Sequence, residues 1–93
     1  SLPKSAAESG APVPSFGCIV YLSTQSGVCH GRVANLEGIE ASAPDQRRLL
    51  GQIVARFKAV VAESLRDGDE PKWIDPPKEK REGESKVFLP VHL

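Results

Sequence analysis

Apolar and polar residues alternate along the first half of the chain, in a pattern that predicts short β-strands. Residues 16–23, FGCIVYLS, form a run of β-branched and aromatic residues, and residues 28–34, VCHGRVA, form a second run after the polar turn at 24–27. A third run, IEASA at residues 39–43, follows the turn-forming segment NLEG. We therefore expect a β-hairpin followed by a third strand.

The two faces of the hairpin follow from this alternation, because a slip of one residue would turn every apolar side chain to the wrong side. With a loop at residues 24–27, the face that we assign to the core carries Cys18, Val20, Leu22, Cys29, Gly31 and Val33. The second face carries Ile19, Tyr21, Ser23, Val28, His30 and Arg32. We expect this second face to be exposed to solvent or to a partner, with His30 across the hairpin from Tyr21.

The middle of the chain has a helical period. Apolar residues recur there at intervals of three and four, which predicts one apolar stripe on an amphipathic helix. The stripe consists of Leu49, Leu50, Ile53, Val54, Phe57, Val60, Val61 and Leu65. Asp45, after Pro44, is the expected first residue of this helix, and Gly68 is the expected left-handed stop. Gly51 within the helix suggests that another element approaches closely there.

The last quarter of the chain predicts a polar loop and one more strand. Residues 69–85 contain three prolines and charges of both signs, so we interpret them as a solvated loop in which Trp73 and Ile74 contact the edge of the core. Residues 86–93, KVFLPVHL, predict a strand at a sheet edge, because Pro90 cannot donate a backbone hydrogen bond. The order β-β-β-α-β predicts an α+β domain with a small, mainly antiparallel sheet packed on one long helix.

Composition and charge limit the class of protein. Residues 1–15 are rich in Ser, Ala, Gly and Pro, so we expect a flexible tail before a single domain at residues 16–93. Twelve basic residues balance twelve acidic residues, which gives no strong attraction to nucleic acid or to an anionic membrane. The chain shows neither the roughly 20 apolar residues of a membrane span nor a signal pattern, so we expect a cytoplasmic protein.

Residues with catalytic or metal-binding chemistry are few and do not form a motif. Cys18 and Cys29 lack the paired spacing of a zinc site. Cys29 and His30 are adjacent on a predicted strand and therefore point to opposite faces, which excludes a simple Cys-His pair. No glycine-rich phosphate-binding motif is present. We expect a protein that is not an enzyme and that uses no metal or cofactor.

Residues 27–50, GVCHGRVANLEGIEASAPDQRRLL, resemble HicB-like antitoxin domains. The shared features are a glycine-started strand, an N-L-x-G corner, a short strand and a helix. The family corner usually reads P-D-L-P-G before a helix that opens near T-x-E-E-A, whereas here the corner is ANLEG and the helix opens DQRR. The leucine and glycine are kept, and the proline and the acidic helix start are not. The resemblance extends over about residues 18–70.

Membership of this family would imply a partial double-stranded-RNA-binding-like or degenerate ribonuclease-H-like fold, no catalysis, and binding of a small RNA-cleaving toxin. Many such antitoxins carry a C-terminal DNA-binding segment, but no helix-turn-helix or ribbon-helix-helix pattern follows here. The resemblance therefore implies a protein partner more than a DNA operator.

Candidate partner-binding residues lie on the second hairpin face and at the start of the helix: Tyr21, His30, Arg32, Arg47 and Arg48. Unpaired sheet edges and a small core also favour a homodimer. The alternative is a small RNA-binding domain, in which basic helix residues contact phosphate and the hairpin face contacts a base.

Overall fold

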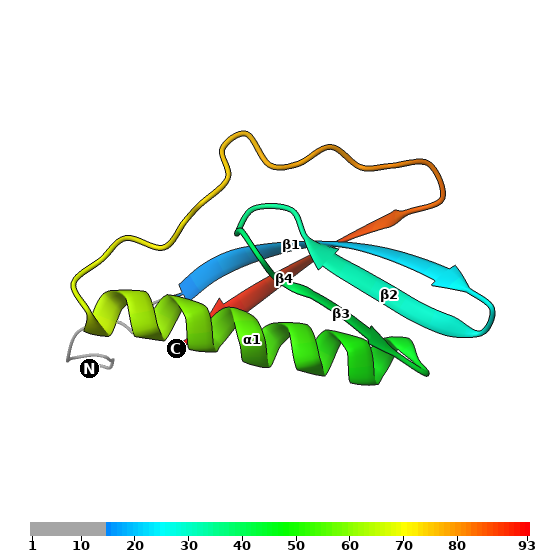
Figure 1. Cartoon of the computed structure of the whole chain (residues 1–93), viewed down its shortest axis with the longest axis horizontal. Coiled ribbons are helices and arrows are strands. Elements are labelled where there is room, and N and C mark those ends of the chain that lie inside the picture. The colour runs from blue at the N-terminus through cyan, green and yellow to red at the C-terminus, as the bar shows by residue number, and fades with distance from the viewer. Residues whose placement is uncertain (1–14) are drawn as a thin grey trace, which may run out of the picture.

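The computed structural model describes residues 15–93, so the predicted N-terminal tail lies outside the described residues except for Ser15. Within this part of the chain the elements follow one another as β1 (Ser15–Gln25), β2 (Val28–Val33), β3 (Glu40–Ala43), α1 (Gln46–Arg66) and β4 (Ser85–His92), as Figure 1 shows. The strands form one antiparallel sheet in the order β3-β2-β1-β4. The predicted α+β class, with a small sheet and one long helix, is confirmed.

The hairpin of β1 and β2 turns on two residues, not on the four that we predicted. Ser26 and Gly27 have φ angles of 52° and 78°, and two consecutive residues with positive φ are typical of the tight turns that match the twist of a hairpin. The ladder consequently continues to the pair of Gln25 and Val28. The predicted loop at residues 24–27 was too long because its sequence, TQSG, is polar throughout and does not show where pairing ends.

The shorter turn moves the pairing by two residues, which leaves each side chain on its predicted face. Val20 and Val33 are paired and buried on the inner face, under α1. On the outer face, Arg32 lies opposite Tyr21. The predicted pairing of His30 with Tyr21 is therefore wrong.

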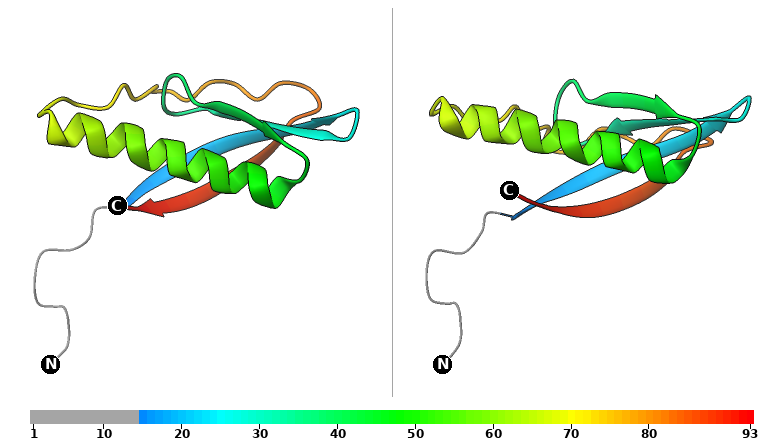
Figure 2. Two further views of the ribbon diagram at one scale, coloured as in Figure 1. Left: turned by 60° about the horizontal axis from the view of Figure 1, so that its bottom comes forward. Right: turned by 90° about the horizontal axis from the view of Figure 1, so that it is seen from below.

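Helix α1 lies across the inner face of the sheet (Figure 2). The Asp45 side chain accepts a hydrogen bond from the backbone N–H of Arg48 at 2.8 Å, and Gly68 follows the helix with a φ of 78°, so both predicted ends are confirmed. The centre of the apolar stripe is buried: Leu49, Ile53, Phe57 and Val61. Leu65 is 48% exposed, because the last turns of α1 extend past the ends of the strands (Figures 1 and 2).

The close approach between α1 and the sheet is at Gly31, not at Gly51. A Cβ atom on Gly31 would lie 2.6 Å from Cδ1 of Ile53 and 3.2 Å from Cδ2 of Leu49. Gly51 is exposed and has open space where its Cβ would be. The glycine that the packing requires is thus in β2, and our interpretation of Gly51 is wrong.

The segment from α1 to β4 starts beside the end of the helix, and its later part, residues 78–84, lies over the outer face of the sheet, on the side away from the helix (Figures 1 and 2). Trp73 contacts the core as predicted, with its ring centre 5.7 Å from that of Phe16 and 5.9 Å from that of Phe57. β4 is an edge strand, as Pro90 predicted. Nowhere in residues 15–93 does a helix combine the length and apolar character that crossing a bilayer requires.

The NLEG corner is built on the side chain of Asn35. Its Nδ2 donates to the carbonyl oxygen of Gly17 at 2.7 Å, and its Oδ1 accepts from the N–H of Ile19 at 3.1 Å. The amide thereby satisfies backbone groups of β1 next to the point where β2 ends. Leu36 is fully buried beside it, which explains why this corner needs both a polar amide and a large apolar residue.

Candidate functional site

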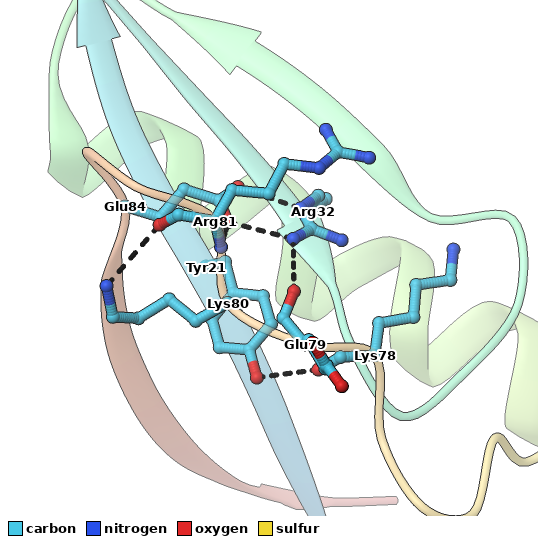
Figure 3. Close-up of polar contacts among 7 residues, drawn as sticks. All are labelled: Tyr21, Arg32, Lys78, Glu79, Lys80, Arg81 and Glu84. Carbon is cyan, nitrogen blue, oxygen red and sulfur yellow. Dashed lines mark hydrogen bonds and ion pairs between the residues drawn. The ribbon is translucent and has the colours of Figure 1, made fainter.

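The outer face of the sheet carries a hydrogen-bonded network between β2 and the loop that precedes β4 (Figure 3). Arg32 donates from Nε and Nη2 to the two carboxylate oxygens of Glu84, at 2.7 and 2.8 Å. Its Nη2 also donates to the carbonyl oxygen of Glu79 at 2.8 Å. The Arg32 and Glu84 side chains are only 12% and 9% exposed, so this bidentate ion pair is largely shielded from water.

Tyr21 lies beneath this ion pair. The Arg32 guanidinium carbon is 4.9 Å from the centre of the Tyr21 ring, which is within the range of a cation–π contact. The Tyr21 hydroxyl donates to the carbonyl oxygen of Lys78 at 2.7 Å, and the Lys78 N–H donates to the carbonyl oxygen of Ala34 at 2.9 Å. The loop is therefore hydrogen-bonded to the sheet at Lys78, Glu79 and Glu84, and our interpretation of it as simply solvated is wrong at these three positions.

The ion pair also sets the charge of its members. The Arg32 guanidinium holds the pKa of Glu84 at about 2, and the N–H of Arg81, which donates to Glu84 at 2.6 Å, acts in the same direction. Glu84 in turn raises the pKa of Arg32. Both groups are ionised at neutral pH and are paired with each other, so neither charge is available to bind a ligand.

Beside the network the outer face is hollowed. The hollow has a volume of about 370 Å³, and Tyr21, Arg32 and Glu84 form part of its lining. The polar side chains that complete it come from three strands and the loop: Ser23, Gln25, His30, Glu40, Ser42 and Arg81. His30 is half-buried, and its Nδ1 lies 2.8 Å from the Ser42 hydroxyl oxygen.

The five candidate residues from the sequence do not form one surface. Tyr21 and Arg32 are engaged within the chain, and His30 lines the hollow with them. Arg47 and Arg48 are exposed at the start of α1, where Arg48 Nε also forms an ion pair with Asp45 Oδ2 at 3.3 Å. Sequence reasoning missed the roles of Arg81 and Glu84, because their charge run has no pattern that distinguishes one member from the next.

The other end of the outer face presents an exposed aromatic ring. Phe88 on β4 is 62% exposed and lies opposite Ile19 on β1. Its ring covers Gly17, where a Cβ atom would lie 2.7 Å from two ring carbons. The absence of a side chain at Gly17 thus lets the ring lie against the strand, with Pro90 next to it on the same face.

Groups suited to metal binding or nucleophilic chemistry do not come together in the described part of the chain. No three side chains of His, Cys, Asp and Glu within residues 15–93 are close enough to hold a metal ion. Burial raises the pKa of the Cys18 thiol to about 11, which keeps it protonated at neutral pH.

Comparison with known proteins adds no family to this description. No family model, curated protein or solved structure gives a significant match to the chain. The fold defines an α+β domain, and the HicB-like resemblance remains a prediction.

Proposed function

We propose that this domain is a non-catalytic, cytoplasmic protein-interaction domain of HicB-like type that binds and neutralises a small RNA-cleaving toxin. The observation that supports the proposal is the exposed ring of Phe88, 62% accessible and seated on Gly17. Aromatic side chains whose position is already set lose little entropy on binding and commonly dominate protein interfaces. Ile19 and Pro90 extend the apolar surface around Phe88.

The sheet edges favour contact through side chains over backbone pairing. β3 has four residues, and Arg56 Nη1 donates to the carbonyl oxygen of Glu40 at 2.8 Å, which occupies an acceptor of this short strand. β4 is interrupted by Pro90, which lacks an N–H. Short strands and proline are common devices against edge-to-edge pairing. The homodimer through sheet edges has no added support from these edges and stays a prediction, whereas the Phe88 surface remains open to the toxin.

The RNA-binding alternative has less support from the geometry. Arg32 is paired with Glu84, Arg48 is paired with Asp45, and Arg56 donates to a backbone carbonyl of β3. Phosphate contacts by these arginines would have to replace contacts within the chain. The other basic residues on the surface of α1 are Arg47, Lys58 and Arg66, and three such residues are few for an affinity that depends on several phosphate contacts.

Co-expression with the product of the adjacent reading frame tests the proposal. We expect a small basic protein that co-purifies with this chain, and we expect Phe88→Ala to weaken the complex by about 30-fold, as loss of an interface hot spot does. Leu65→Ala is the matched control, because Leu65 is also an exposed large apolar residue but lies on α1. A complex that tolerates Phe88→Ala as well as Leu65→Ala would contradict the proposed surface, and an adjacent product that does not bind would contradict the antitoxin function.

A further inference from the structure

We propose that the hollow on the outer face is a binding site for a small hydroxylated molecule that carries an oxyanion, either a phosphate or a carboxylate. Its volume of about 370 Å³ lies within the usual range for small-molecule sites, roughly 300–1,000 Å³. The lining is mostly polar, so the ligand must be recognised by hydrogen bonds and charge. This inference goes beyond the proposed toxin partner and does not depend on it.

Several polar side chains around the hollow have hydrogen-bonding groups that make no contact within residues 15–93. Within residues 15–93 the Arg81 guanidinium makes no hydrogen bond or ion pair, and Arg81 is exposed on the loop above the sheet (Figure 3). His30 contacts Ser42 through Nδ1, which leaves Nε2 for a ligand. The Ser23 and Gln25 side chains likewise have no hydrogen bond in the described part of the chain and add hydroxyl and amide groups. These donors come from different elements but line one space.

The charges of the lining favour an anion at Arg81. Glu84 accepts hydrogen bonds from the Arg32 guanidinium and from the Arg81 N–H, so its negative charge is already neutralised. The Arg81 guanidinium has no ion-pair partner within residues 15–93, and its planar fork matches two oxygens of a phosphate or carboxylate. Glu40 on β3 is an exposed carboxylate that can accept from a ligand hydroxyl.

The hollow and the Phe88 surface are at opposite ends of the outer face of β1. The hollow is lined by Tyr21, Ser23 and Gln25, whereas Phe88 lies over Gly17 and opposite Ile19. A ligand in the hollow therefore leaves the Phe88 surface free. Loss of ligand binding and loss of partner binding are distinguishable by the variant that causes each.

The test is an NMR titration of the full chain with three probes: inorganic phosphate, acetate and ribose 5-phosphate. We expect saturable shifts of the backbone amides of His30, Ser42 and Arg81, and tighter binding of ribose 5-phosphate than of inorganic phosphate because the sugar hydroxyls add hydrogen bonds; equal affinities would contradict a hydroxylated ligand. Arg81→Ala should weaken binding at least 10-fold. Lys80→Ala is the control, because Lys80 is next to Arg81 in the sequence and carries the same charge, but its side chain does not line the hollow. We expect Lys80→Ala to change the affinity less than 2-fold.

Two further results would overturn the proposal. Equal weakening by Arg81→Ala and Lys80→Ala would show a general charge effect, and the absence of saturable shifts with all three probes would show that no oxyanion binds. Both positions are exposed, so the dispersion of the amide spectrum will show that each variant is folded. Saturation by phosphate but not acetate, or the reverse, identifies which oxyanion the site accepts.

Discussion

Arg32 and Glu84, which are 52 residues apart in the sequence, meet through two hydrogen bonds of 2.7 and 2.8 Å. Arg32 lies on β2, inside the sheet, and Glu84 immediately precedes β4 at the sheet edge. The pair consequently holds the end of the long connection where the last strand begins. It contributes to the tertiary structure as well as lining the hollow.

Replacement of Glu84 by glutamine should destabilise the domain by about 1–3 kcal/mol at pH 7, because a hydrogen bond to a charged group is lost and Arg32 remains shielded. The measurement is the free energy of unfolding from chemical denaturation. Glu82→Gln removes the same charge from an exposed position two residues earlier and should change stability by less than about 0.5 kcal/mol. Equal effects of the two substitutions would show that the bidentate contact is unimportant.

The same pair makes stability depend on acid. The pKa of Glu84 in the folded chain is about 2, below its ordinary value of 4.5, so its contribution is complete above pH 4.5 and is lost as the pH falls towards 2. Unfolding free energies measured between pH 5 and pH 2, roughly the window set by these pKa values, should fall less steeply for Glu84→Gln than for the unaltered chain. Parallel pH profiles would contradict this assignment.

Gly31→Ala and Gly51→Ala should change stability in opposite directions. At Gly31 the added Cβ would lie 2.6 Å from Ile53, so we expect a loss of about 1–3 kcal/mol from overpacking. At Gly51 the space is open and the helix gains an alanine, so we expect a gain of about 0.5–1 kcal/mol. Thermal unfolding of the two variants measures both signs, and stabilisation by Gly31→Ala would refute the packing described for α1 on β2.

Phe57→Ala should cost about 3–5 kcal/mol, since Phe57 is fully buried at the centre of the core. Its ring centre lies 5.9 Å from that of Trp73, so the variant should also shift the Trp73 fluorescence towards longer wavelength as water reaches the indole. Leu65→Ala, at a 48% exposed position, should have a much smaller effect. An unchanged denaturation midpoint for Phe57→Ala would contradict the orientation of the helix.

The two thiols should react at different rates with an alkylating reagent at pH 8. Cys18 is fully buried and burial raises its pKa to about 11, so its native-state reaction requires opening of the sheet. Cys29 is only half-buried and should be modified first. Mass spectrometry after peptide digestion measures both rates, and equal rates in native protein would show that Cys18 is accessible.

The sequence by itself determined the features that depend on neighbouring residues. Asp45 and Gly68 mark the ends of the helix because capping and left-handed termination act within one turn. Alternation assigned Val20 and Val33 to one face and Tyr21 and Arg32 to the other. This assignment was correct although the predicted turn was two residues too long, because a shift of two residues keeps each side chain on the same face. The strand and helix order, and hence the α+β class, followed from these local patterns.

Only the tertiary structure decided which distant residues meet. The loop before β4 contains Glu79, Glu82 and Glu84, and its sequence does not show which of them Arg32 binds; the path of the chain over the outer face selects Glu84. Gly31 shows the same dependence, because a side chain at this position would collide with Ile53, which belongs to another element. The hollow likewise requires residues from three strands and a loop. Such contacts depend on how the elements pack, and that geometry leaves no periodic signal in the sequence of any one segment.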